Sequence, residues 1–157
     1  MSEHPTHARE AFTREALERV AHTIADVERA THAEIRISIR DVREASEADL
    51  SLKELALKEF TTLEMFKTEG RTGILLFILY HERKFYVLGD EGVHTYVQPE
   101  TWEDVAATLG YHFGRADYEG GLKSALLKIQ HHMMGKLPVI ETPRNEMDDS
   151  VIIDGEQ

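Results

Sequence analysis

The chain carries two adjacent carboxylates between two glycines, in the stretch Gly89-Asp90-Glu91-Gly92. This stretch directly follows the apolar run FYVL (85–88), which has the composition of a buried strand. Carboxylate oxygens and backbone carbonyls of a glycine loop are the ligands that calcium and magnesium prefer. The alternative is an exposed turn, because glycine supplies a positive φ and Asp can hydrogen-bond its own backbone. The local sequence therefore leaves both a cation site and a turn open.

The predicted topology brings further polar residues to the same place. A strand around 35–39 and a strand over 74–80 are joined by a helix, so we expect them to run parallel, and a hairpin then reverses the strand that ends at Gly89. The end of the third strand should therefore lie beside the starts of the first two. This arrangement predicts one polar rim of the sheet, made up of Glu34, Thr68, Arg71, Asp90 and Glu91.

Three residues carry the remaining chemistry of this rim. Asp117, in the loop GRADYEGG, is a further acidic candidate, with N-capping of the last helix as its alternative. Arg71 and His94 are the catalytic candidates: beside an ion acting as Lewis acid, Arg71 would hold a phosphate oxygen and His94 or Glu91 would transfer a proton. A guanidinium favours a phosphate site over a pure cation site, so Arg71 discriminates between the two.

The nine histidines show no metal-binding spacing. His131 and His132 are adjacent, so their side chains diverge on a helix. His7 lies in a terminus that is expected to fray, and His81 is expected in a solvated turn. No Ser-His-Asp arrangement can be assigned, and no phosphate-binding glycine motif is present.

Hydrophobic periodicity predicts the elements that position these residues. Apolar residues at helical spacing indicate helices over about 7–30, 46–66, 99–113 and 118–133. The alternation of Ile35, Ile37 and Ile39 with polar residues indicates a strand with one wet face, which suits an edge of the sheet. The run ILLFILY (74–80) indicates a central strand covered on both faces, followed by a tight turn at HERK into an antiparallel partner.

Composition excludes several classes of function. The 157 residues include 29 acidic and 18 basic ones, and the net charge of -11 has the wrong sign for a nucleic-acid partner. The lack of cysteine excludes disulfides, thiolate catalysis and zinc sites built on sulfur. No apolar window approaches a membrane span, and the polar N-terminus predicts a cytoplasmic protein. We expect one domain over 1–138, followed by an acidic disordered tail over 139–157.

The motifs of the chain resemble those of a known family. The succession of AEIRISI, RTGILLFILYHERKFYVLGDEGV and TWEDVAATLGYHFGRADYEGGLKSAL, closed by the proline of GKLP, is similar to the TPM domain, and most similar to its short cytoplasmic bacterial branch. The resemblance implies an α/β fold, a three-layer α-β-α sandwich with a small mixed sheet. It also implies a divalent-cation site at the sheet rim and, for some members, phosphatase activity. The family's loop after the third strand matches Gly89 to Gly92, and the start of its first strand matches Glu34.

These observations support three hypotheses of function. The leading one is a binding module that takes a divalent cation (calcium or magnesium) or a protein partner through Glu34, Asp90 and Glu91. The second is a metal-assisted phosphatase acting on phosphomonoesters. The third is a structural interaction domain in which the rim is only a turn.

Overall fold

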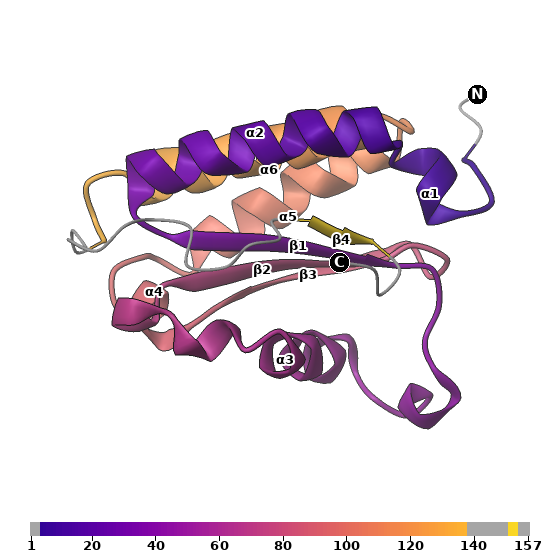
Figure 1. Cartoon of the computed structure of the whole chain (residues 1–157), viewed down its shortest axis with the longest axis horizontal. Coiled ribbons are helices and arrows are strands. Elements are labelled where there is room, and N and C mark those ends of the chain that lie inside the picture. The colour runs from indigo at the N-terminus through magenta and orange to yellow at the C-terminus, as the bar shows by residue number, and fades with distance from the viewer. Residues whose placement is uncertain (1–3, 138–150, 154–157) are drawn as a thin grey trace.

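The computed structural model describes residues 4–137 and 151–153, and its centre is a four-stranded sheet in the order β3-β2-β1-β4 (Figure 1). Parallel pairing joins β1 (Glu34–Arg40) to β2 (Gly73–Leu79), and antiparallel pairing joins β2 to β3 (Lys84–Gly89). These pairings confirm the predicted crossover and hairpin. Every residue of β2 is buried, as expected for a central strand.

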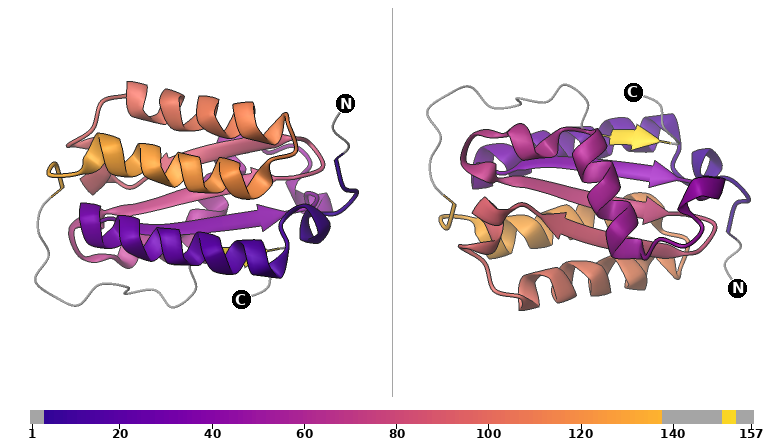
Figure 2. Two further views of the ribbon diagram at one scale, coloured as in Figure 1. Left: turned by 90° about the horizontal axis from the view of Figure 1, so that it is seen from above. Right: turned by 90° about the horizontal axis from the view of Figure 1, so that it is seen from below.

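Helices cover both faces of this sheet (Figures 1 and 2). One face carries α2 (Arg14–Thr31), α5 (Glu100–Phe113) and α6 (Tyr118–Met133), and α3 (Leu52–Thr62) lies on the other. The result is the predicted α/β sandwich of three layers with a small mixed sheet. Short elements complete the chain: α1 (Ala8–Ala11), α4 (Glu91–His94) and the 3-10 turns η1 (Ala45–Glu47), η2 (Met65–Lys67) and η3 (Glu69–Arg71).

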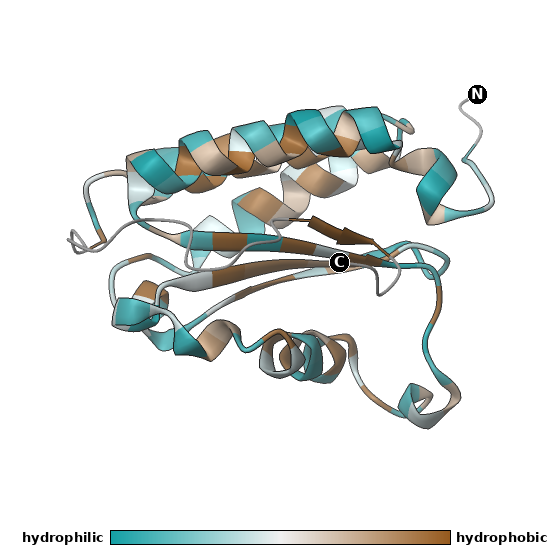
Figure 3. Ribbon diagram, in the orientation of Figure 1, coloured by the Kyte–Doolittle hydropathy of each residue, from teal (hydrophilic) through white to brown (hydrophobic). Residues whose placement is uncertain are grey.

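Two apolar clusters hold the layers together, one on each side of the sheet. In Figure 3 much of the sheet has the brown colour of hydrophobic residues. The larger cluster lies under α2, α5 and α6, and the strands contribute to it Ile35, Ile37, Ile39, Ile74, Leu76 and Ile78. The smaller cluster packs the other side of β2 against α3 and consists of Leu55, Ala56, Phe60, Met65, Leu75, Phe77 and Leu79. The alternation of apolar residues between the two faces follows from the pleat of the strands, in which successive side chains point to opposite sides.

The N-terminal helical region consists of two helices instead of one. The Thr13 side chain caps α2 by accepting a hydrogen bond from the Ala16 N–H at 3.2 Å. A break at an N-cap lets the preceding segment take a new direction, because the capping residue is extended. As a result α1 leaves the axis of α2 and docks beside the sheet, where His7 and Ala8 approach the residues that follow β1.

The prediction that the first strand is an edge strand is wrong. β1 lies between β2 and β4, and six of its seven residues are buried, including the polar Arg36 and Ser38. Its polar side is covered by other polar groups: Ser38 donates a hydrogen bond to Glu59 of α3, and Arg40 forms an ion pair with Glu47. The alternating polar residues of β1 thus lie on a face that is covered through a hydrogen bond and an ion pair.

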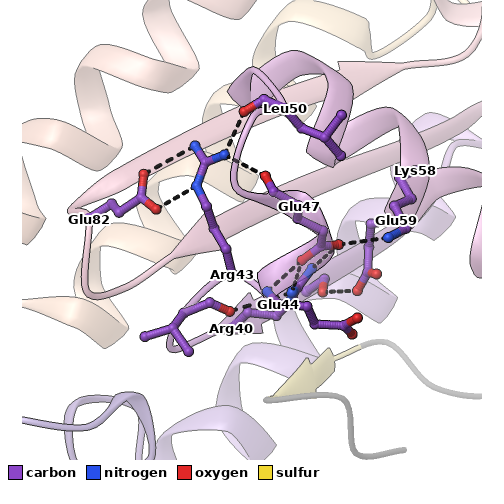
Figure 4. Close-up of polar contacts among 10 residues, drawn as sticks. Arg40, Arg43, Glu44, Glu47, Leu50, Lys58, Glu59 and Glu82 are labelled. Carbon is purple, nitrogen blue, oxygen red and sulfur yellow. Dashed lines mark hydrogen bonds and ion pairs between the residues drawn. The ribbon is translucent and has the colours of Figure 1, made fainter.

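A polar network fixes the connection between β1 and α3 (Figure 4). The Glu47 carboxylate receives Arg40, the Lys58 ammonium at 3.0 Å and the Glu44 N–H at 2.8 Å. Arg43 donates to the Glu82 carboxylate, with a distance of 2.6 Å from Nε to Oε2. Arg43 thereby joins the polar connection between β1 and α3 to the turn between β2 and β3.

Part of the segment predicted as a disordered tail joins the sheet. Residues Val151–Ile153 form β4, which pairs in parallel with Ile37 to Ile39 of β1, and Ile152 is buried. For these three residues the prediction of a disordered tail is wrong, since a short apolar run suffices to pair with an open strand edge. The rest of the tail, and the domain boundary at 138, lie outside the described residues.

Candidate functional site

The predicted polar rim is assembled at one end of the sheet. The ladder continues there beyond the strands: the Asp90 N–H donates to the Gly73 carbonyl at 2.9 Å, and the Glu34 N–H donates to the Thr72 carbonyl at 3.1 Å. Glu34 therefore lies at the same edge as Asp90, as the topology predicted. Arg71 reaches this edge from η3.

Asp90 does not present a free carboxylate at this rim. The Arg71 guanidinium donates to both of its oxygens, from Nε at 2.7 Å and from Nη2 at 2.8 Å. The same carboxylate accepts the Glu91 N–H at 2.8 Å and so caps α4. The Glu91 side chain is 73% exposed, and its carboxylate lies 3.3 Å from Arg71 Nη1. Hydrogen bonding to Asp90 raises the pKa of Arg71. The positive charge beside the Asp90 carboxylate is therefore the Arg71 guanidinium.

The two glycines of the stretch are required by close packing. A Cβ atom on Gly92 would lie 2.0 Å from the Gly70 carbonyl oxygen, and a Cβ atom on Gly89 would lie 2.8 Å from the Trp102 ring. Arg71 takes the left-handed conformation, with φ 56°, at the point where α4 presses against η3. The Gly-Asp-Glu-Gly stretch is therefore the start of a helix locked against an arginine-bearing turn.

The structure also gives the surroundings of the other predicted site residues, Glu34, His94 and Thr68. Glu34 is buried, with its side chain at the start of β1. His94 packs edge-on against the Trp102 ring, with 5.7 Å between ring centroids. Thr68 is buried and accepts the Thr72 N–H at 3.1 Å.

Asp117 does not join the rim. It caps α6 by accepting the Gly120 N–H at 3.2 Å, and its carboxylate lies 2.8 Å from His112 Nδ1. The neighbouring Phe113 packs on Phe85, next to the start of β3, which is the opposite end of the sheet. The alternative role as an N-cap is the one that the structure shows.

A cavity of about 400 Å³ lies at that opposite end, beyond the carboxyl end of β2. Packed aromatic rings form part of its wall: Phe12 and Tyr118 have ring centroids 5.1 Å apart, and Tyr80 and Tyr118 have centroids 5.8 Å apart. Burial raises the pKa of the Tyr80 hydroxyl, which donates to the Pro5 carbonyl. The polar lining consists of His4, Thr6, Tyr80, His81, Arg83, Lys84 and Tyr118. Sequence reasoning missed this cavity because its lining comes from segments far apart in the chain.

Beside the cavity, His7, Asp41 and His81 converge. One potential ligand atom from each lies within 4.8 Å of the other two, and within the described ranges this is the one group of three acidic or histidine side chains with that property. Glu34, Asp90 and Glu91 do not form such a group. The expectation that His7 frays is wrong, since it caps α1 and lies beside His81. No local spacing could have signalled this cluster.

Comparison with known proteins identifies the family. Residues 6–132 match the family model of the TPM domain. This chain belongs to the TPM domain family. No curated protein sequence matches it.

Solved structures share the fold of this TPM domain. The BA42 protein of the psychrophilic bacterium Bizionia argentinensis is similar with a TM-score of 0.78 and 20% identity, over 90% of this chain and 94% of that one. The N-terminal domain of a P. gingivalis protein has a TM-score of 0.62 and 16% identity, over 79% and 77% of the two chains. The N-terminal domain of cg2496 from Corynebacterium glutamicum has a TM-score of 0.61 and 8% identity, over 94% and 95%. In the described part of the TPM domain no helix is long and apolar enough to span a bilayer.

Proposed function

We propose that this TPM domain is a cytoplasmic ligand-binding module, and that its ligand is a small molecule with an apolar body and a negatively charged group. The observation that carries the proposal is the cavity beyond β2. Its volume of about 400 Å³ is within the range of small-molecule sites, and its lining combines aromatic rings with a few polar groups. Such a lining binds an apolar body by contact area and fixes its orientation by polar contacts.

Arg83 supports a ligand that carries negative charge. It lines the cavity in a protein whose net charge is -11. Its φ of 55° is left-handed, a conformation that costs a residue with a Cβ atom about 1 kcal/mol and that Gly or Asn adopts more readily. The adjacent Glu82 pairs with Arg43 and Lys84, and no ion pair of Arg83 is found in the described part of the chain. The Arg83 side chain is therefore available to an anion at the cavity mouth.

A fluorescent probe with these properties tests the proposal. Anilinonaphthalene sulfonate has an aromatic body and one sulfonate, and we expect the parent protein to bind it saturably. Arg83→Asn keeps a residue that tolerates the left-handed backbone and removes the charge, so it should weaken binding roughly tenfold, the value of one charge-assisted hydrogen bond. Arg29→Asn is the matched control, since Arg29 is exposed near the C-terminal end of α2 and does not line the cavity.

A second variant fills the cavity without removing a core residue. Gly110 lines the cavity from α5, and a Cβ atom there would meet only the Phe85 ring at 3.6 Å, an ordinary contact. Gly110→Leu should therefore abolish probe binding while the melting temperature stays equal or rises, because Gly destabilises a helix interior. Unchanged probe binding in both Arg83→Asn and Gly110→Leu would refute the cavity as the ligand site.

Cation binding at the rim is the second candidate, because acidic residues from separate elements share that edge. Calcium or magnesium would use Glu34, Asp90 and Glu91, and it would have to displace Arg71 from the Asp90 carboxylate. Arg71→Ala should then strengthen calcium binding, whereas Asp90→Asn and Glu34→Gln should abolish the calcium-dependent rise in melting temperature.

The same variants distinguish a phosphatase from a module that only binds a cation. In a phosphatase Arg71 would hold a phosphate oxygen, so hydrolysis of a phosphomonoester should require the metal and should fall with Arg71→Ala and with His94→Ala. The opposite effects of Arg71→Ala on calcium affinity and on turnover separate a cation-binding module from an enzyme. If neither the probe nor calcium binds, a structural domain that contacts a protein partner is the hypothesis that these experiments favour.

A further inference from the structure

We propose that His7, Asp41 and His81 form a binding site for a transition-metal ion such as Zn²⁺. The three side chains come from three separate segments: the N-cap of α1, the residue after β1 and the turn after β2. Their ligand atoms lie within 4.8 Å of one another. The site is distinct from the rim, since it lies at the opposite end of β1 and β2.

The sheet itself sets the positions of two of the ligands. Two backbone hydrogen bonds follow directly after the strands: the Tyr80 N–H donates to the Arg40 carbonyl at 2.8 Å, and the His81 N–H donates to the Asp41 carbonyl at 3.0 Å. Asp41 and His81 are therefore held side by side by backbone hydrogen bonds. A site whose ligands are held by backbone hydrogen bonds at strand ends requires little reorganisation when the ion binds.

The third ligand is held by the docking of α1. The Ala8 N–H donates to Asp41 Oδ1 at 2.7 Å, which fixes both the carboxylate and the start of the helix. His7 precedes this N–H, and its ring lies beside the His81 ring with 6.1 Å between centroids and 30° between planes. A hydrogen bond that orients a ligating carboxylate is a regular feature of metal sites.

The separation of the His81 and Asp41 ligand atoms is compatible with a shared metal ion. His81 Nε2 and Asp41 Oδ1 are 3.6 Å apart, which is too long for a hydrogen bond. Two ligand atoms at about 2.05 Å from a tetrahedral zinc ion lie roughly 3.4 Å from each other. Small rotations of the exposed His7 and His81 side chains would bring the other ligand atoms to this separation.

The donor set selects the class of metal. Two imidazoles and one carboxylate suit zinc, copper, nickel or cobalt, whereas calcium and magnesium prefer oxygen ligands alone. Three protein ligands leave a coordination position open, as in catalytic zinc sites. His81 also lines the cavity, so an anionic group bound there could fill that position. This last point depends on the proposed cavity ligand, but metal binding itself does not.

Titration of the full chain with metal ions tests the site. After treatment with a chelator, the protein should bind one equivalent of Zn²⁺ by calorimetry, and Co²⁺ should give the visible absorption of a four- or five-coordinate ion. His7→Ala, His81→Ala and Asp41→Asn should each lower the affinity at least tenfold. Asp41→Asn retains an oxygen that can accept the Ala8 N–H, so it isolates the ligand charge from the docking of α1. His22→Ala is the matched control, because His22 is exposed on α2.

The outcomes separate a built metal site from scattered binding by surface histidines. Zinc binding that persists in all three variants, or that is lost equally in His22→Ala, would show that surface histidines hold the ion and would overturn the proposal. Equal melting temperatures of parent and variants in chelator show that the variants are folded. Loss of zinc binding in His7→Ala with sulfonate probe binding intact supports a separate metal site, while Arg83→Asn should change probe binding only. Failure of the parent to bind zinc while it binds the probe overturns the metal site and leaves the cavity proposal standing.

Discussion

Glu47 offers a sharp test of how the β1–α3 connection is held. Its side chain is 2% exposed and carries a negative charge beside Arg40 and Lys58. Hydrogen bonding to Arg40 lowers the pKa of the Glu47 carboxyl from 4.5 to about 2. This shift corresponds to about 3 kcal/mol of stability at neutral pH, at 1.36 kcal/mol for each pKa unit. Glu47→Gln keeps the size of the side chain and an acceptor for the Glu44 N–H, so its main effect should be the loss of this charge.

The pH dependence follows from the direction of the shift. Because the folded state lowers the pKa of Glu47, its contribution is fully present above the unfolded pKa near 4.5 and is lost as the pH falls toward 2. The difference in unfolding free energy between the parent and Glu47→Gln should therefore be about 3 kcal/mol at pH 7 and roughly half of that at pH 3. Other titrating groups are common to both proteins, so they cancel in this difference.

Urea denaturation followed by circular dichroism at pH 7, 5 and 3 measures this difference. Glu64→Gln is the control, since Glu64 pairs with Lys67 on the surface, where both side chains are mostly exposed. Such a pair contributes at most about 1 kcal/mol. A difference near zero at pH 7, or one that does not change with pH, would refute the assignment of Glu47 as a charged residue stabilised by Arg40.

Three further predictions concern packing, and chemical denaturation measures each. Leu76→Ala removes a fully buried side chain of β2 and should cost about 2–5 kcal/mol, so a loss near zero would contradict its place in the core. Ile152→Asp should detach β4 and cost at least the roughly 1.5–3 kcal/mol of burying an isoleucine, and removal of 139–157 should likewise lower the free energy of unfolding. An unchanged free energy of unfolding would argue against the pairing with β1. Gly92→Ala should cost about 1–3 kcal/mol because its Cβ atom would overlap the Gly70 carbonyl, and a neutral effect would show that α4 can move away from η3.

The sequence predicted those parts of the fold in which apolar side chains are buried and polar side chains face water. The all-apolar β2 and the amphipathic helices were recognisable because burial and periodicity agree along the segment. β1 was misjudged because its polar face is buried by partners such as Glu47 and Glu59, and a polar residue in a sequence does not reveal whether water or another side chain solvates it. β4 was missed because three apolar residues among acidic ones give no periodic signal.

The candidate site was predictable only as far as strand direction determines it. Parallel and antiparallel pairing brought Arg71 and Asp90 to one edge, but the pairing of their charges depends on the left-handed turn at Arg71, which no sequence pattern indicated. The cluster at the other end depends on the docking of α1 through Asp41. Residues 7, 41 and 81 are too far apart in sequence for any local motif to join them.

The position of β4 in the chain affects how the protein is made on the ribosome. β4 covers one edge of β1, yet Val151 is synthesised roughly 110 residues after Arg40. At about 5–20 residues per second, this edge emerges roughly 5 to 20 seconds before its partner. An uncovered strand edge is a template for pairing with another chain, and charged side chains are one way in which proteins reduce that risk. One edge of β1 is thus uncovered during most of the synthesis of the protein. The charges of Arg36 and Arg40 oppose pairing of this edge with another chain during that time.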